Sequence, residues 1–140
     1  MFLGKVFKNI NSKYKLIKFK DIRFNSSECK TNDVFFAISG NKSNGNNYIN
    51  EAIKKGAKII VSSLKFEGFN KNKILFIHSK DPRKLLSETA NNFYYKKPKN
   101  IIAVTGTNGK TSIANFYYQI LTLNNKKVAA IGTLGILSKK

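Results

Sequence analysis

The 140-residue sequence contains very little cysteine, histidine or acid. Cys29 is the only cysteine, so no disulfide can form within the chain. The only histidine is His78, and a metal site built on it would have to recruit carboxylates from a chain with just seven Asp and Glu residues. The sequence therefore predicts neither a disulfide framework nor a histidine-based metal centre.

Long apolar stretches are missing as well. No apolar run approaches the roughly 20 residues that a membrane-spanning helix needs. The first residues, Met1 to Lys8, lack the apolar core and the small-residue cleavage site of a secretory signal. We therefore expect a cytoplasmic protein with no membrane insertion.

Arginine is scarce although the formal net charge is +19. Such a charge favours an anionic partner, such as nucleic acid or a membrane surface. A dedicated nucleic-acid binder uses arginine to form bidentate hydrogen bonds with phosphates and base edges, but Arg23 and Arg83 are the only arginines here. The excess of lysine and asparagine is typical of an AT-rich coding sequence. We predict no nucleic-acid partner, and expect the charge only to help attract an anionic nucleotide at low salt.

Residues 101–112 read IIAVTGTNGKTS and have the composition of a phosphate site. The β-branched run Ile101 to Val104 predicts a buried strand, and the apolar spacing from Ile113 to Leu121 predicts a helix. Gly106 and Gly109 then lie at a strand-to-helix turn. Glycines at such a turn let backbone N–H groups approach phosphate oxygens, and the start of the helix adds positive potential.

The side chains at this turn suit a nucleotide. Lys110 can reach the β- and γ-phosphates, and the Thr111 hydroxyl can join the ligands of a Mg²⁺ ion. We predict a nucleoside triphosphate and Mg²⁺ as the bound cofactors, with Lys110 and Thr111 catalytic and Thr111 also a metal ligand. The alternative is a chance Gly-Asn-Gly turn. The predicted nucleotide-binding residues are Gly106, Thr107, Asn108, Gly109, Lys110, Thr111 and Ser112.

The loop is shorter than a usual P-loop, since Val104 stands where the first glycine would be. T-G-T-N-G-K-T after a hydrophobic strand resembles the ATP-binding loop of the Mur ligases, which extend the peptide on UDP-N-acetylmuramic acid during peptidoglycan synthesis and cell-wall biogenesis. The apolar strand Val34 to Ile38 and its flanks resemble the uridine-binding start of the same family. The matching positions are Ser26, Asp33, Phe35, Ala37, Gly40, Gly45, Tyr48 and Ile49.

The resemblance implies which residues meet the UDP substrate. Phe24 and Ser26 are expected to approach the uracil or the ribose. The family's D-S-R triplet is altered here, because Asn25 and Ser27 stand where an acidic residue and an arginine are usual, so a salt bridge between them cannot form. The residues expected to approach the same nucleotide after the strand are Asn41, Lys42 and Ser43.

The chain alternates predicted helices and strands, which indicates an α/β fold with a small mixed sheet. We expect strands at Ala57 to Ser62 and Ile74 to Ile77, and a helix opened by Asp81 and Pro82. The basic, proline-containing stretch before Asn100 predicts a domain boundary. The resemblance then implies a UDP-N-acetylmuramic-acid-binding domain over 1–97 and the start of a central ATP-binding domain over 98–140, in which a strand from Val128 to Ile131 completes a βαβ unit.

The activity implied by the resemblance is ATP-dependent amide ligation through an acyl phosphate. The I-G-T-L-G stretch after Ala130 resembles the branch that adds the third amino acid, meso-diaminopimelate or L-lysine with the former the commoner, to UDP-N-acetylmuramoyl-L-alanyl-D-glutamate. Family members continue beyond the position of Lys140, so we expect this chain alone to be an inactive monomer. Alternatives are the D-alanyl-D-alanine-adding ligase, a folylpolyglutamate-type ligase, or a non-catalytic nucleotide-binding module.

Overall fold

The computed structural model describes residues 1–40 and 43–138. The chain divides into two compact units, Met1–Lys97 and Pro98–Lys140. Within the described ranges, no helix has the length and apolar character needed to cross a membrane. Each unit is described separately below.

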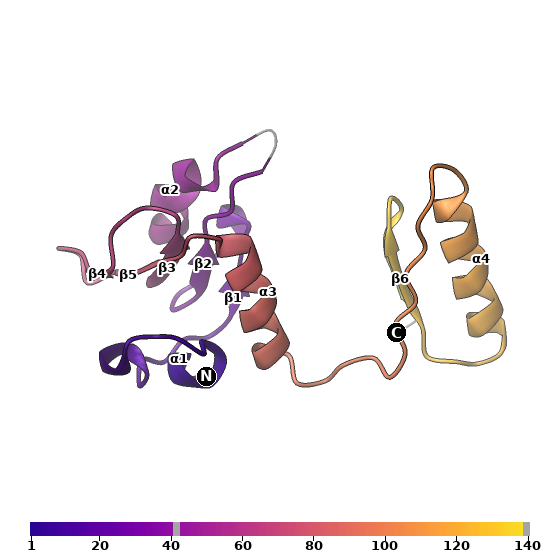
Figure 1. Ribbon diagram of the computed structural model, residues 1–140, viewed down its shortest axis with the longest axis horizontal. Coiled ribbons are helices and arrows are strands. Elements are labelled where there is room, and N and C mark those ends of the chain that lie inside the picture. The colour runs from indigo at the N-terminus through magenta and orange to yellow at the C-terminus, as the bar shows by residue number, and fades with distance from the viewer. Residues whose placement is uncertain (41–42, 139–140) are drawn as a thin grey trace. The chain divides into compact units, whose positions relative to one another are not determined.

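The first unit is built on a five-stranded sheet with the order β1-β2-β3-β5-β4 (Figure 1). Neighbouring strands run parallel from β1 through β2 and β3 to β5, and β4 lies antiparallel beside β5 at the edge. This mixed sheet confirms the predicted α/β class. The strands are β1 (Ile22–Arg23), β2 (Val34–Phe36), β3 (Ile59–Ser62), β4 (Gly68–Phe69) and β5 (Leu75–His78).

Helices cover both faces of this sheet. The longest, α3 (Pro82–Phe93), lies on the same face as α1 (Leu3–Val6), and α2 (Ile49–Lys54) lies on the other (Figure 1). Three short 3₁₀ turns complete the unit, namely η1 (Ser12–Tyr14), η2 (Ser26–Glu28) and η3 (Gly45–Tyr48).

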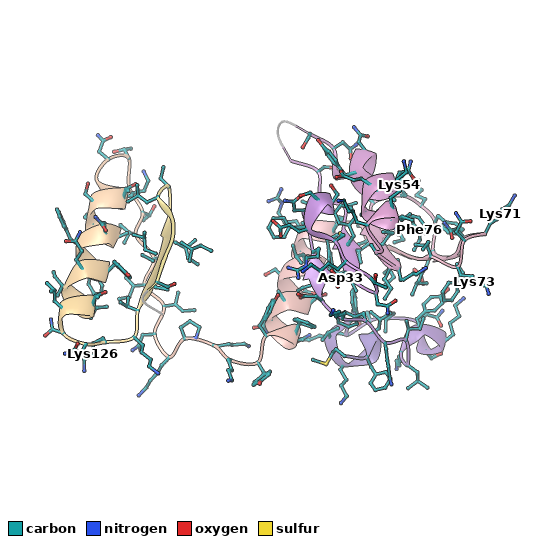
Figure 2. All side chains as sticks on the ribbon, turned by 180° about the vertical axis from the view of Figure 1, so that it is seen from behind. Asp33, Lys54, Lys71, Lys73, Phe76 and Lys126 are labelled. Carbon is teal, nitrogen blue, oxygen red and sulfur yellow. The ribbon has the colours of Figure 1, made fainter. Side chains whose placement is uncertain are left out.

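The central strands are buried on both faces because apolar side chains alternate across them without a polar break. In β2, Val34 and Phe36 enter the core under α1 and α3, whereas Phe35 enters the core under α2. Such continuous apolar runs are typical of parallel strands sandwiched between helices. Figure 2 shows the contrast with the surface, where Lys71 and Lys73 project from the loop between β4 and β5.

The second unit contains α4 (Lys110–Leu123) and a hairpin of β6 (Ala129–Gly132) and β7 (Gly135–Ser138). The predicted helix behind the glycine loop is therefore present. The predicted strand Ile101 to Val104 was wrong, because these residues are not in a strand and Ile101 is 81% exposed.

The βαβ unit expected in 98–140 is consequently not formed. Strand β6 pairs antiparallel with β7 through the turn at Thr133 and Leu134, rather than parallel with residues 101–104. A hairpin closed by two residues has a low loop-closure cost, whereas a parallel pair needs a long crossover and burial on both faces. The hairpin thus satisfies the backbone of β6 locally.

Candidate functional site

The carboxyl ends of the parallel strands bring several polar loops to one edge of the first unit. Ligands of open parallel sheets bind at this edge. The loops touch one another there. The Asn46 side-chain amide donates to the Ser63 hydroxyl at 3.3 Å, which joins η3 to the end of β3. The Arg83 guanidinium donates to the Ser39 carbonyl at 3.2 Å, which joins the first turn of α3 to the loop after β2.

Phe24 and Ser26 follow β1 at this edge but differ in exposure. Phe24 is 70% exposed, so its ring is available to stack on a flat base. Ser26 is only 6% exposed, and its hydroxyl donates to the Glu51 carboxylate on α2 at 2.7 Å. Ser26 therefore exposes little surface to a ligand, and its hydroxyl proton is held by Glu51.

The altered triplet around Ser26 is held by hydrogen bonds of the Asn25 side chain. The Asn25 side-chain oxygen accepts from the Ser27 backbone N–H at 3.2 Å and from the Ser27 hydroxyl at 2.9 Å. Its amide group donates to Glu28 at 3.2 Å. Asn25 is thus the N-cap of η2, and the turn that carries Ser26 keeps its shape without an acid–arginine pair.

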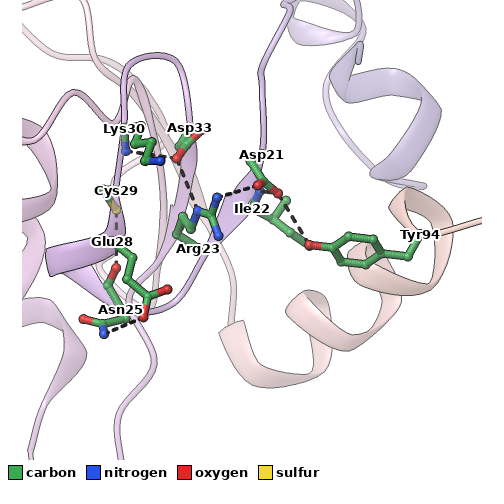
Figure 3. A network of polar contacts seen from close by, with 9 residues as sticks. All are labelled: Asp21, Ile22, Arg23, Asn25, Glu28, Cys29, Lys30, Asp33 and Tyr94. Atoms are coloured by element: carbon green, nitrogen blue, oxygen red, sulfur yellow. Dashed lines mark hydrogen bonds and ion pairs between the residues drawn. The ribbon is translucent and has the colours of Figure 1, made fainter. Parts of the chain in front are cut away.

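An ion-pair network fixes the end of β1, immediately before Phe24 (Figure 3). The Arg23 guanidinium contacts Asp21 at 2.6 Å and the buried Asp33 at 3.5 Å. Burial by itself lowers the pKa of Arg23, but the carboxylates of Asp21 and Asp33 outweigh it and raise that pKa, which keeps the cation charged. Tyr94, which follows α3, donates to Asp21 at 3.4 Å, so the network also ties α3 to β1.

The loop after β2 was expected to hold three substrate-binding residues. Asn41 and Lys42 lie outside the described residues. Ser43 is exposed, and its carbonyl accepts from the Gly40 N–H at 2.9 Å, which closes the base of the loop. Gly45 then presses against the end of β2, because a Cβ atom there would lie 2.4 Å from the Ile38 nitrogen. Only glycine allows this close approach.

The glycine loop lies in the second unit at the start of α4. Gly106 and Gly109 have φ angles of 141° and 75°, which residues with side chains rarely adopt. Gly109 is the N-cap of α4 and has no side chain to cap the first turn. The first N–H groups of the helix, from Lys110 onward, therefore point outward at a positive helix end. The predicted loop residues Thr107, Asn108 and Ser112 are exposed around it.

Lys110 and Thr111 are the first two residues of α4, and their side chains contact different parts of the second unit. The Lys110 ammonium donates to the Thr107 carbonyl at 3.0 Å and to the Gly106 carbonyl, so its charge lies against the loop. The Thr111 hydroxyl lies 3.4 Å from that of Thr133 in the β6–β7 turn. No group of three metal-ligating His, Cys, Asp or Glu side chains occurs in the described ranges. A hydroxyl suits Mg²⁺ as one oxygen ligand among phosphates and waters, so the donor set fits a nucleotide-borne ion.

Three side chains at the sheet edge were not predicted as site residues. Glu51 had no sequence signal, because a glutamate on an amphipathic helix is ordinarily a solvated surface residue. Arg83 was visible as one of two arginines in a lysine-rich chain. Asn46 is an ordinary residue of a polar loop. Their roles depend on contacts between segments 17 to 44 residues apart, which no local pattern reports.

Comparison with known proteins relates the first unit to a defined family. The family model described as "Mur ligase family, catalytic domain" matches residues 18–94. This stretch falls within Met1–Lys97 and ends before the glycine loop.

Individual relatives extend the similarity into the second unit. The chain is 41% identical over 131 residues to a UDP-N-acetylmuramoyl-L-alanyl-D-glutamate--2,6-diaminopimelate ligase of Rickettsia montanensis, covering 91% of this chain and 26% of that protein. It is 43% identical over 122 residues to the enzyme of that name from Clostridium tetani, covering 84% and 25%. A match over 91% of the chain necessarily includes the glycine loop. The chain spans about a quarter of the length of these relatives.

Solved structures share the fold of this chain. A UDP-N-acetylmuramoyl-L-alanyl-D-glutamate--2,6-diaminopimelate ligase matches 99% of this chain and 29% of its own with a TM-score of 0.67 at 22% identity, which shows a shared fold. The MurF ligase of Thermotoga maritima in complex with ADP matches 77% of this chain and 24% of its own, with a TM-score of 0.59 and 27% identity.

Proposed function

This chain belongs to the Mur ligase family, and from that premise we propose that it serves ATP-dependent amide ligation on a UDP-N-acetylmuramoyl peptide. One observation carries the proposal. The same chain has a Gly-Asn-Gly-Lys-Thr loop at the start of a helix, and polar loops at the carboxyl ends of its parallel strands. The names of the relatives at about 40% identity support the same reaction.

The two units have separate tasks in this proposal. Met1–Lys97 binds the UDP end of the substrate through Phe24, Ser26 and Ser43, together with Asn41 and Lys42, which the family resemblance alone supports. Pro98–Lys140 contributes the ATP phosphate loop. The ADP complex of the Thermotoga maritima ligase supports a nucleotide in this family.

The reaction proceeds from carboxylate to amide. A substrate carboxylate oxygen attacks the γ-phosphorus of ATP, the bond to the β-phosphate breaks, and ADP departs, which leaves an acyl phosphate. The incoming amine then attacks the acyl carbon, loses a proton and displaces inorganic phosphate. Since two anions must meet, Lys110 and the outward-facing N–H groups at the start of α4 offset their repulsion and orient the reacting oxygens. Thr111 and the phosphates would hold Mg²⁺, which supplies further charge neutralisation.

We propose meso-diaminopimelate as the added amino acid. The relatives from Rickettsia and Clostridium carry 2,6-diaminopimelate in their names, which supports this choice over L-lysine. The alternative is addition of D-alanyl-D-alanine, the dipeptide in the name of a ligase of similar fold from Acinetobacter baumannii. The mass of the product made by a full-length ligase that contains this chain distinguishes the three.

A hybrid enzyme tests the proposal. The matching quarter of the Rickettsia montanensis relative is replaced by this chain, and the product from UDP-N-acetylmuramoyl-L-alanyl-D-glutamate, ATP and each amino acid is identified by mass spectrometry. We expect ATP-dependent formation of a ligation product, with the amino acid chosen by the part of the Rickettsia montanensis enzyme that the hybrid retains. A folded hybrid, with a cooperative unfolding transition like that of the parent, that forms no product would count against the proposal.

A further inference from the structure

The hydroxyl of Ser26 makes a short hydrogen bond that crosses from η2 to α2. Its Oγ lies 2.7 Å from Oε2 of Glu51, 25 residues further along the chain. A hydroxyl-to-carboxylate bond of this length is charge-assisted and strong. Ser26 is 6% exposed, so few other partners compete for its proton.

This bond fixes the direction in which Ser26 can interact with a ligand. A serine hydroxyl has one proton and two lone pairs, and a carboxylate only accepts. The proton of Ser26 is therefore committed to Glu51. The oxygen that remains for a ligand can only accept a hydrogen bond.

A donor on the ligand is consequently required beside Ser26. Phe24, two residues earlier, offers a 70% exposed ring on which a base can stack, which favours the base over the sugar as the group that reaches Ser26. Uracil carries an N–H at ring position 3. Cytosine carries a bare acceptor nitrogen at the same position, which would face the lone pairs of Ser26, and it could donate to Ser26 only from its 4-amino group in a shifted pose.

We infer that Glu51 is a positioning residue that makes Ser26 an obligate hydrogen-bond acceptor, and that this polarity selects uridine over cytidine nucleotides. The inference rests on the proposed UDP site in the first unit. It assigns to Glu51 a role in specificity that acts through Ser26 and requires no direct contact with the ligand.

Glu28 offers a matched control. It lies in the same 3₁₀ turn as Ser26 and is exposed, but its carboxylate accepts from Asn25 rather than from Ser26. Glu28→Gln thus removes one negative charge beside the site and leaves the Ser26–Glu51 bond in place. Glu51→Gln substitutes an amide whose N–H can donate to Ser26, which frees the serine proton.

The test is calorimetric titration of the 140-residue chain and its variants with UDP and with CDP. We expect the wild-type protein and Glu28→Gln to prefer UDP, and Glu51→Gln and Ser26→Ala to lose about tenfold of that preference, as for one hydrogen bond lost to a buried partner. Thermal unfolding of each variant monitors the fold. A purely structural role for Glu51 would weaken both nucleotides equally and leave the ratio unchanged.

The outcomes separate the two proposals. Wild-type binding of UDP without preference over CDP, or an unchanged ratio in folded Glu51→Gln, overturns the role of Glu51 and leaves the UDP site standing. A folded wild-type protein that binds neither nucleotide overturns the UDP site itself, and the inference with it.

Discussion

Lys110 is the residue on which the proposed chemistry depends most. Its ammonium lies against the glycine loop at the positive end of α4. In the hybrid ligase, Lys110→Ala should lower the turnover number on the order of 10²- to 10³-fold, comparable to loss of one preorganised charge-stabilising donor. Lys126→Ala, in the turn that follows the other end of the helix (Figure 2), is the control and should leave the rate unchanged. Equal rates for both variants would remove Lys110 from the mechanism.

Gly45 marks a point where backbone packs directly on backbone. In Gly45→Ala, the new methyl group would meet the Ile38 nitrogen at 2.4 Å and the Ala37 carbonyl carbon at 2.7 Å, and neither can move aside easily. We expect a loss of unfolding free energy of roughly 1–3 kcal/mol, as for overpacking in a core, measured by urea denaturation. Gly132→Ala meets no atom within 4 Å and should be close to neutral. A Gly45→Ala variant as stable as the wild type would contradict the packing described.

Cys29 gives the first unit a pH dependence at high pH. Burial raises the pKa of its thiol from 9.0 to about 11. The unfolded chain therefore loses the thiol proton first as pH rises, so stability present below pH 9 falls until about pH 11. Compared with Cys29→Ala at each pH, the wild type should lose on the order of 2 kcal/mol of unfolding free energy across this window. A constant difference between the two proteins would show that the thiol is not buried.

At the scale of elements, α3 depends on its first residues. The Asp81 side chain accepts from the Lys84 backbone N–H at 3.0 Å, and Pro82 occupies the first helical position. Asp81→Ala should cost about 1 kcal/mol of stability, whereas Asp81→Asn, which retains the acceptor, should cost much less. Thermal unfolding of the two variants side by side measures the difference. Equal losses in both would mean that the charge, and not the cap, stabilises the helix.

The long buried elements were predictable from the sequence, and the short ones were not. The strands predicted at Val34 to Ile38, Ala57 to Ser62 and Ile74 to Ile77 correspond to β2, β3 and β5 within two residues at each end. Strands of two residues, such as β1 and β4, have no period to recognise. The strand predicted at Ile101 to Val104 shows the opposite error, since apolar composition predicts a strand only where partners are available to pair with it.

The candidate site was predictable to the same degree. The glycine loop has a local signature, and the helix expected behind it occurs, although the strand expected before it does not. The part of the site at the carboxyl ends of the strands is built by contacts between distant segments. The Ser26–Glu51 bond and the Arg23–Asp33 ion pair therefore could not be predicted from the spacing of residues in the sequence. Asp33 matched a family position without a role, and the structure gives it one as a buried anchor for the end of β1.

At the scale of the whole molecule, the two units differ in how they are stabilised. The buried core of the described residues lies entirely in Met1–Lys97. Helix α4 has no buried residue, and five of its large apolar side chains are about half exposed or more. Hydrophobic burial is the main source of folding free energy, so the first unit is the part of the chain that burial stabilises. The exposed large apolar side chains of α4 are Ile113, Phe116, Tyr117, Ile120 and Leu123.

The most direct test of the central claim is calorimetric titration of the 140-residue chain with UDP-N-acetylmuramoyl-dipeptide at low and at moderate salt. We predict saturable binding that persists at moderate salt, because the contacts are specific rather than a consequence of the +19 charge. A Ser26→Ala, Asn41→Ala double variant should lose it. A folded protein that shows no binding, or binding that salt abolishes, would contradict the assignment of the first unit as a UDP-substrate site.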